Sequence, residues 1–312
     1  RWRSAVKTSG LSFEARRRFW QLFTARAVRA PNVTPADTDF ETLLAETRNQ
    51  AHAAEAGSVT MVGAGPGDPE LLTLRAVRAL QSADVILFDD LVAREVLDFA
   101  RREAKKMLVG KTGYGPSCKQ NEINALMVSL AKAGRRVVRL KGGDPLIFGR
   151  ATEEIEACRA ANIAFEIVPG ITSAQGAAAR IGVSLTERVT ARRVQYITGH
   201  DRNGALPDDI DWSSVADATA TTVVYMPKKT IGELTTRAMA QGLDPLTPAV
   251  AVFGATRANE TVIAAPVSQI AKKIAQAKLD GPALVLIGRA MAGAVSQSGE
   301  TVTPVSHDTK SA

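Results

Sequence analysis

The sequence predicts an α/β protein, and three observations support this class. From residue 59 onward, short apolar runs alternate with stretches of helical periodicity, which is typical of βα units and a largely parallel sheet. Several of the apolar runs end directly in glycine or in a charged residue, as expected where ligands bind at the carboxyl ends of strands. The chain has 312 residues, 45% of them hydrophobic, which is enough for one large or two ordinary cores.

Residues 1–56 are expected to form a helical segment. Phe13, Trp20 and Phe23 fall on one helical stripe with arginines beside it, so residues 1–30 predict an amphipathic helix. A second helix is expected over 36–56 after two chain-breaking prolines. We expect the aromatic stripe to pack within a helical subdomain or at a dimer interface. Binding of nucleic acid by its arginines is the alternative.

A first α/β domain is expected over residues 57–170. Four helical patterns, around 71–82, 92–102, 121–133 and 151–161, separate its strands. The predicted buried strands are Val59–Val62, Val85–Phe88, Met107–Val109, Val137–Leu140 and Phe165–Val168.

A second α/β domain is expected over residues 171–294. Helices are predicted near 230–241 and 267–277, and residues 295–312, rich in Ser, Thr and Gly, are expected to form a disordered tail. The predicted strands are Val194–Thr198, Thr222–Met226, Ala249–Phe253, Thr261–Ala265 and Leu284–Ile287.

The loop after the first predicted strand reads Gly-Ala-Gly-Pro-Gly-Asp over residues 63–68. Its glycines allow close backbone approach, while Pro66 fixes φ and donates no N–H, which favours an adenosine-sized ligand. The loop departs from the dinucleotide fingerprint, whose third glycine would fall at Asp68. Met61 stands where the common Rossmann-like methyltransferases usually carry an acidic residue.

Other strand ends carry polar or small residues that could line the same cleft. Asp89 follows the second predicted strand, and Lys111 follows the third. The fourth is followed by Gly142-Gly143-Asp144, where glycines permit close approach and the carboxylate can accept hydrogen bonds. An N-cap, a surface charge and a tight turn are the structural alternatives for these three sites. Thr172 and Ser173 could cap a helix or donate to a ligand.

Composition narrows the classes of partner. The formal net charge of +7 favours an acidic partner, but an aromatic content of 5% gives little support to a stacking platform for nucleic acid. Cys118 and Cys158 lack a metal or redox spacing, which suits a reducing compartment. Because we find neither a signal-peptide pattern nor an apolar run near the ~18 residues that span a bilayer, we expect a cytoplasmic protein without membrane contact.

Between about residue 58 and residue 290 the chain resembles the uroporphyrinogen-III C-methyltransferases in the order and spacing of five blocks. The resemblance implies a two-domain tetrapyrrole (precorrin) methyltransferase fold with S-adenosylmethionine in the interdomain cleft. It implies methylation of uroporphyrinogen III at C2 and then C7, giving precorrin-2 for siroheme or cobalamin, without a metal. A precorrin methyltransferase acting later in corrin synthesis is the alternative. The blocks are Val62–Asp68 with Asp89, Val109–Lys111, Arg139–Pro145, Phe148–Arg150 and Val168–Thr172.

The resemblance also implies roles for individual residues. Asp89 matches the proton acceptor of the family and Lys111 its proton donor, whereas Arg150 is a candidate for binding the carboxylates of the substrate. His200 matches a family block without an evident chemical role. The implied cofactor contacts are Pro66, Gly142, Gly143, Asp144, Ile147, Thr172, Ser173, Met226 and Ala255.

Residues 13–20 resemble the end of the helical dimerisation region of siroheme synthases, in which the methyltransferase follows a dehydrogenase and ferrochelatase module. We expect a homodimer on this basis. We also expect that the chain, which does not show the nucleotide-binding part of that module, neither oxidises precorrin-2 nor inserts iron.

Overall fold

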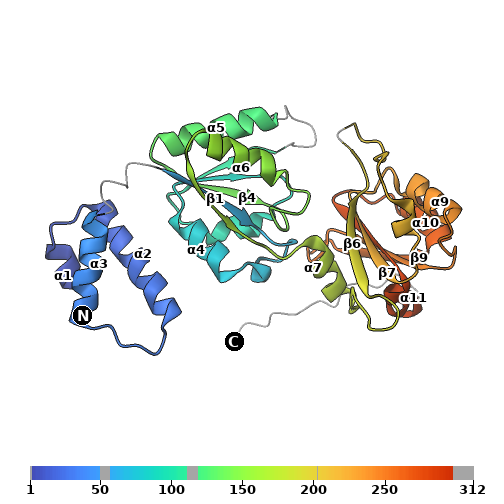
Figure 1. Cartoon of the computed structure of the whole chain (residues 1–312), viewed down its shortest axis with the longest axis horizontal. Helices are drawn as coiled ribbons and strands as arrows, with labels where there is room; N and C mark the ends of the chain where they lie inside the picture. The colour runs from blue at the N-terminus through green and yellow to red at the C-terminus, as the bar shows by residue number, and fades with distance from the viewer. Residues whose placement is uncertain (1, 50–56, 111–118, 202, 298–312) are drawn as a thin grey trace.

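The computed structural model describes residues 2–49, 57–110, 119–201 and 203–297. Three helices come first, and two α/β units follow, each built on a five-stranded sheet (Figure 1). Within these ranges no helix is both long and apolar enough to cross a membrane.

The N-terminal helices are α1 (Arg3–Thr8), α2 (Phe13–Arg29) and α3 (Asp37–Asn49). Phe19 is fully buried between them. The ring centroids of Trp2 and Phe40 lie 5.4 Å apart, as do those of Phe19 and Trp20. Trp20 and Phe23 of the stripe therefore pack among the three helices, which is the first of the two arrangements expected, while the side chain of Phe13 lies outside the description.

Arg17 links α2 to the first α/β unit. Its guanidinium donates to the carbonyl of Ser82 and lies 3.6 Å from the carboxylate of Asp84. Asp84 also pairs with Arg101 at 2.6 Å and with Arg136 at 2.7 Å. One of the arginines considered for nucleic acid is thus engaged within the protein.

The first sheet is wholly parallel, with the order β3-β2-β4-β1-β5. Four of the strands match the predicted apolar runs to within one residue, but the third, expected as a buried strand over Met107–Val109, spans Lys105–Leu108 and is mostly exposed. The five strands are β1 (Ser58–Gly63), β2 (Val85–Phe88), β3 (Lys105–Leu108), β4 (Arg136–Lys141) and β5 (Ala164–Val168).

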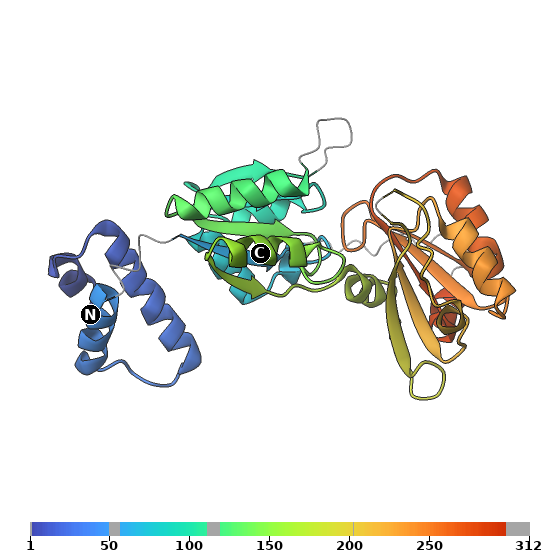
Figure 2. The ribbon, with the colours of Figure 1, turned by 45° about the horizontal axis from the view of Figure 1, so that its top comes forward.

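Helices cover both faces of this sheet (Figure 2). On one face α4 (Leu74–Ser82) packs over Val62, Ile86 and Leu140. On the other, α5 (Gln120–Lys132) and α6 (Ala151–Ala160) pack over Val59, Met61 and Leu87. Burial on both faces explains why the inner strands β1, β2 and β4 are largely apolar, whereas the edge strands β3 and β5 are partly exposed.

Two helix predictions in this unit were wrong in detail. The helix expected over 92–102 is a 3-10 helix, η3 (Arg94–Phe99), because its amides bond three residues back, as Val96 does to Ala93 at 3.2 Å. The helix expected from residue 71 begins at Leu74, after the short η2 (Pro69–Leu71). Thr73 sets this start by accepting a hydrogen bond from the amide of Ala76 at 3.1 Å.

The second sheet is mixed, with the order β6-β7-β10-β8-β9. Only β6 and β7 pair in parallel; the other three pairings are antiparallel. The seven residues between β8 and β9 are too few for a parallel crossover. The strands are β6 (Arg193–Thr198), β7 (Ala220–Tyr225), β8 (Pro248–Phe253), β9 (Thr261–Pro266) and β10 (Ala283–Ile287), again as the apolar runs predict.

Within the described residues, six helices accompany the second sheet. α9 and α10 bury Leu234 and Ile270 against it, and these two helices match the predicted ones. The helices are α7 (Ser173–Arg180), α8 (Trp212–Val215), α9 (Ile231–Ala240), α10 (Val267–Ala277), η4 (Arg289–Met291) and α11 (Ala292–Gln297). α11 runs past residue 295, and the rest of the expected tail, 298–312, lies outside the described residues.

The two units touch through α7 and through the turn between β8 and β9. α7 lies between the two sheets in both ribbon views (Figures 1 and 2). The hydroxyl of Thr256 accepts a hydrogen bond from the amide of Asp68 at 2.9 Å, and the guanidinium of Arg257 donates to the carbonyl of Leu91. The glycine-rich loop of the first unit is therefore held by the second.

Candidate functional site

A cavity of about 950 Å³ lies where the two units meet. The first unit contributes the loops that follow β1, β2, β3 and β4, as the chemistry at the strand ends predicts. The second contributes residues after β6, β7 and β8 and the approach to β10. The volume is at the upper end of the range for sites that enclose a small molecule.

Glycines allow three loops to meet at backbone contact in the wall of the cavity. Gly65 and Gly143 exchange hydrogen bonds, with N–O distances of 2.7 and 3.2 Å. A Cβ placed on Gly63 would lie 2.5 Å from the amide nitrogen of Gly170. A Cβ on Gly170 would in turn collide with the carbonyl oxygen of Gly143. The loops after β1, β4 and β5 thus form one wall because no side chain separates them.

Asp144 ties two of these loops together. Its carboxylate accepts hydrogen bonds from the amide of Leu146 at 2.8 Å and from that of Gly170 at 2.9 Å. The residue is buried and lines the cavity. The carboxylate expected to accept from a ligand is therefore engaged with the backbone on both oxygens.

Asp89 is held at the cavity by a buried arginine. The Nη2 of Arg139 lies 2.6 Å from the Oδ1 of Asp89, and its Nε lies 2.8 Å from the Oε1 of Glu154. Burial opposes the positive charge of Arg139, but the carboxylates of Asp89 and Glu154 outweigh it, so the pKa of Arg139 is raised. The guanidinium of Arg139 thus holds the carboxylate of Asp89 at the edge of the cavity.

Lys141 lies beside this group, with its Nζ 3.0 Å from the Oε1 of Glu154. Burial and the charge of Arg139 lower the pKa of Lys141, although Glu154 opposes them. Sequence reasoning missed both Arg139 and Glu154 as site residues. A charged residue inside the apolar run Val137–Leu140 was the available signal, since charges are rarely buried unless they are paired.

Lys111 lies outside the described residues, as does Cys118. Gly110, the residue before it, lines the cavity, and a Cβ on Gly110 would lie 3.1 Å from the Cα of Asp89. The end of β3 thus lies directly beside Asp89.

Thr172 and Ser173 line the cavity at the start of α7. The hydroxyl of Thr172 accepts from the amide of Gln175 at 3.3 Å, and the side chain of Gln175 accepts from the amide of Thr172 at 3.2 Å. This capping box fixes the start of α7 and accounts for Thr172 by itself. Ser173 lies close to Gly143: a Cβ placed on Gly143 would be 3.7 Å from the Oγ of Ser173.

The remaining residues assigned to the cofactor also line the cavity. Pro66, Gly142 and Ile147 come from the first unit, and Met226 and Ala255 come from the second. The structure thus brings together every predicted site residue that it describes.

Several lining residues have left-handed backbone. The φ of Met226 is 56°, that of Phe148 is 50° and that of Arg150 is 55°. Non-glycine residues rarely adopt this conformation, and such strain concentrates at ligand sites. The sequence pattern carries no signal for it.

Phe148 and Tyr225 form an aromatic contact in the cavity that sequence reasoning also missed. Their ring centroids are 5.1 Å apart, and both residues line the cavity. Burial raises the pKa of Tyr225. The available signals were that Phe148 opens the block Phe148–Arg150 and that Tyr225 immediately precedes Met226 at a strand end.

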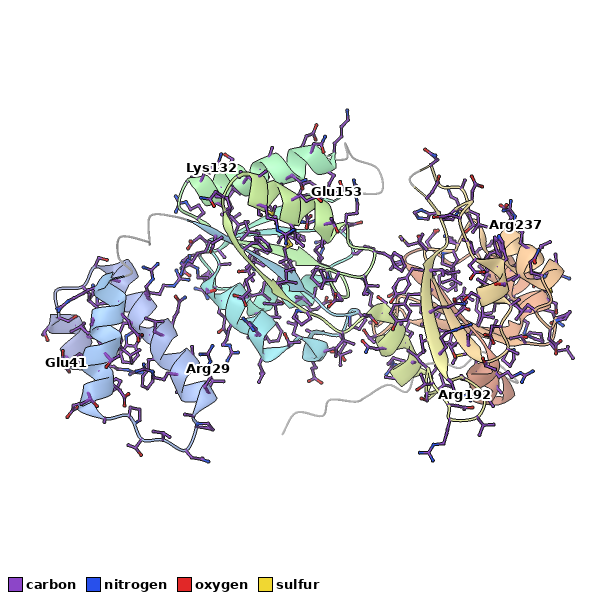
Figure 3. The ribbon with its side chains drawn as sticks, in the orientation of Figure 1. Arg29, Glu41, Lys132, Glu153, Arg192 and Arg237 are labelled. Atoms are coloured by element: carbon purple, nitrogen blue, oxygen red, sulfur yellow. The ribbon has the colours of Figure 1, made fainter. Side chains whose placement is uncertain are left out.

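Arg150, the predicted carboxylate-binding residue, lines the cavity but is already paired. Its Nε and Nη2 donate to the two oxygens of Glu153 at 2.7 and 2.8 Å. Glu153 projects from α6 at the side of the first unit that faces the second (Figure 3). The salt bridge competes with any carboxylate that approaches Arg150.

The lining is strongly basic. Seven Lys and Arg residues face two carboxylates, Asp89 and Asp144. Among the described residues, the ammonium groups of Lys119 and Lys229 have no hydrogen-bonding or ionic partner, whereas the other five cations are paired. The seven are Lys119, Arg139, Lys141, Arg150, Lys228, Lys229 and Arg257.

Cys158 is a poor candidate for reactive chemistry. It is buried on α6, and burial together with the charge of Glu154 raises the pKa of its thiol to about 11. In the ranges that the structure describes, no group of three or more His, Cys, Asp and Glu side chains is arranged to hold a metal ion.

Known proteins share this fold and much of this sequence. The family model for tetrapyrrole (corrin/porphyrin) methylases matches residues 58–271. The uroporphyrin-III C-methyl transferase of Thermus thermophilus, solved in complex with S-adenyl homocysteine, is 36% identical, with a TM-score of 0.65 over 75% of this chain and 98% of that one. A cobalt precorrin-4 methyltransferase of cobalamin biosynthesis is 26% identical, with a TM-score of 0.67 over 75% of this chain and 95% of that one.

Curated relatives extend the similarity into the N-terminal helices. The siroheme synthase of Chromobacterium violaceum is 42% identical over 92% of this chain, and the match spans 60% of the relative's length. The chain thus corresponds to less than two thirds of that relative. The family match, the identity and the shared two-sheet architecture together show that the chain belongs to the tetrapyrrole (corrin/porphyrin) methylases and is a methyltransferase.

Proposed function

We propose that the protein transfers methyl groups from S-adenosylmethionine to C2 and C7 of uroporphyrinogen III and so forms precorrin-2. One observation carries the proposal: a single cavity gathers glycine-lined strand ends, the paired Asp89 and a basic lining. The substrate named for the Thermus relative, which this chain covers almost completely, supports the same assignment.

The residues present fit S-adenosylmethionine. The backbone is open at Gly142 and Gly143, and Ile147, Met226 and Ala255 give the cavity an apolar part for an adenosine-sized group. When bound, the cofactor supplies a methyl group already activated by a sulfonium, so positioning is the main task left to the protein. We assign the cofactor contacts to Pro66, Gly142, Gly143, Asp144, Ile147, Thr172, Ser173, Met226 and Ala255.

Asp89 is proposed to accept the proton that leaves the methylated pyrrole. The guanidinium of Arg139, 2.6 Å away, holds this carboxylate in place at the cavity. Asp89 is also partly exposed toward the cavity, so a substrate can reach it. Lys111, which follows Gly110 beside Asp89, is proposed as the proton donor.

The basic lining is proposed to bind the carboxylates of the substrate. Uroporphyrinogen carries eight of them, and Lys119 and Lys229 offer ammonium groups that no described residue neutralises. Arg150 can contribute once its pairing with Glu153 is shared or broken. We assign one of these contacts to Lys229, on the turn between β7 and α9.

A later precorrin methyltransferase is the second candidate. The likeness in fold to cobalt precorrin-4 methyltransferase, with a TM-score of 0.67, favours it. The identity of 36% to the uroporphyrin-III enzyme against 26% to the precorrin-4 enzyme favours the first candidate.

We further propose that the protein acts as a homodimer in the cytoplasm. The sequence match to siroheme synthases in the N-terminal helices supports dimerisation, because the resembling region is their dimerisation region. The aromatic stripe itself packs among α1, α2 and α3, so the partner would contact another surface.

Incubation with uroporphyrinogen III and labelled S-adenosylmethionine tests the function. Two methyl groups per product molecule are expected by mass spectrometry. Absence of transfer to uroporphyrinogen together with methylation of a precorrin would favour the second candidate instead.

A further inference from the structure

A fully buried carboxylate lies beneath the cavity without being part of its lining. Glu154, on the first turn of α6, has an exposed fraction of 0%. Its Oε1 accepts from the Nε of Arg139 at 2.8 Å, from the Nζ of Lys141 at 3.0 Å and from the Nε2 of Gln120 at 3.2 Å. Its Oε2 is buried and has no hydrogen-bonding partner among the described residues.

Burying the carboxylate of Glu154 costs free energy, because the charge loses its contact with water. This cost must be offset by other charges and hydrogen bonds. The arrangement is a chain of four charges in which Glu154 and Asp89 flank Arg139, with Lys141 beside Glu154. The two negative and two positive charges balance. Every charge in the chain is therefore paired although most of it is out of contact with water.

Arg139 is held at each nitrogen of its guanidinium. The Nε donates to Glu154 and the Nη2 to Asp89, and the Nη1 donates to the carbonyl of Leu140 at 3.2 Å. Because a guanidinium is planar, fixing the Nε side also fixes the direction in which the Nη2 points. Glu154 therefore controls where Arg139 presents its donor to Asp89.

We propose that Glu154 is a positioning residue: it orients the guanidinium of Arg139, which in turn aims the carboxylate of Asp89 into the cleft. The inference rests on the proposed function, in which Asp89 accepts a proton. Glu154 touches neither substrate nor cofactor, since it does not line the cavity.

The same contacts would also be present if Glu154 had a purely structural role. In that case Glu154 would serve only to neutralise Lys141 and Arg139 and so preserve the fold. The two roles differ in what happens when Glu154 and Lys141 are removed together, because the remaining pair of Arg139 and Asp89 stays neutral as a whole.

The test compares Lys141→Met with the double variant Lys141→Met/Glu154→Leu. The single variant is the reference, because it already includes any direct effect of losing Lys141 from the cavity and keeps the contact between Glu154 and Arg139. Replacing both members of a buried pair by apolar side chains often leaves stability unchanged. We expect the double variant to lose about 10- to 100-fold in kcat relative to the single one, with the KM for S-adenosylmethionine unchanged. A kcat within twofold of the single variant overturns the inference.

A second readout does not depend on the substrate. In protein labelled with 15N-arginine, the Nε–H signal of Arg139, assigned by its loss in Arg139→Lys, should persist in Lys141→Met and shift in the double variant. An unshifted signal in the double variant overturns the inference, whether or not the wild-type protein methylates uroporphyrinogen. A wild-type protein that fails to methylate uroporphyrinogen overturns the proposed function instead. If the double variant does not fold, Lys141→Met/Glu154→Gln takes its place. An Nε–H signal of Arg139 and a kcat that both equal those of Lys141→Met then overturn the inference. A loss of kcat relative to Lys141→Met supports it.

Discussion

The Nη2 of Arg139 lies 2.6 Å from the Oδ1 of Asp89, although the two residues are 50 positions apart in the chain. β2 and β4 are neighbours, with Leu87 opposite Arg139 in the register, so the residue that follows β2 comes within reach of the arginine. The parallel sheet thus builds this pair from two separate stretches of sequence.

Asp89→Asn should lower kcat about 100- to 10,000-fold, because an amide cannot accept the proton that a carboxylate accepts. Binding of S-adenosylhomocysteine, measured by calorimetry, should stay within about twofold. The adjacent exposed Asp90→Asn is the matched control and should retain activity. Methyl transfer by Asp89→Asn at the wild-type rate would remove the assignment.

Lys111→Met should likewise lower turnover more than cofactor binding if its ammonium donates a proton. Steady-state kinetics with each substrate varied in turn separate the two effects. Lys119→Met is the comparison, since it removes a cation that lines the cavity. Equal losses in the two variants would indicate a general effect of charge.

Lys229→Gln should raise the KM for uroporphyrinogen about three- to tenfold and leave kcat unchanged, because it removes a binding contact that is the same in the ground and transition states. The effect should shrink as salt is added. Lys272→Gln, an exposed lysine on α10 outside the cavity, provides the control. An unchanged KM in Lys229→Gln would contradict the assigned contact.

Gly170→Ala should destabilise the protein by about 1–3 kcal/mol or more, since the new methyl group would collide with the carbonyl of Gly143. Urea unfolding measures the change. Gly293→Ala is the matched control, because a Cβ there meets nothing within 4 Å. Equal urea midpoints for the two variants would contradict the prediction, since they would show that the loops of Gly170 and Gly143 can move apart to admit the methyl group.

Acid should remove a contribution to stability from Asp84. Burial raises the pKa of this carboxyl, but hydrogen bonds and charge from Arg136, with the charge of Arg101, outweigh it and lower the pKa to about 2. Because the folded pKa lies below the unfolded one, the carboxylate stabilises the fold above about pH 4, and this contribution is lost as the pH falls toward 2. It amounts to about 1–2 kcal/mol.

Asp84→Asn tests this. The variant should be less stable at pH 6 by urea unfolding, and the difference from the wild type should narrow between pH 4 and pH 2.5. Asp209→Asn, an exposed carboxylate, should show no such narrowing. A constant difference across this range would contradict the prediction.

The strands were predictable because apolar runs that are buried on both faces stand out from their surroundings, as Val85–Phe88 does. The direction of pairing in the second sheet was not, since it depends on which strands become neighbours. η3 differed from its prediction because a 3-10 helix over Arg94–Phe99 and a short α-helix have similar apolar spacing.

The candidate site was predictable as far as it follows strand ends and matches a family. Asp89, Gly142 and Gly143 line one cavity as the strand-end argument expects. The burial of Glu154 against Arg139 depends on side-chain positions in three dimensions, which spacing does not encode. The left-handed backbone of Met226 is imposed by its surroundings, because methionine has no preference for it.

The hydrogen bond between Thr256 and Asp68 has a kinetic consequence. The proposed substrate is a macrocycle larger than the cofactor, and spreading the two units at this turn to admit it would stretch that bond and the one from Arg257 to Leu91. The glycine-rich loop would then lose its support from the second unit at the moment of entry. Under the proposed function, admission of the substrate and binding of the methyl donor would thereby be linked through the turn between β8 and β9.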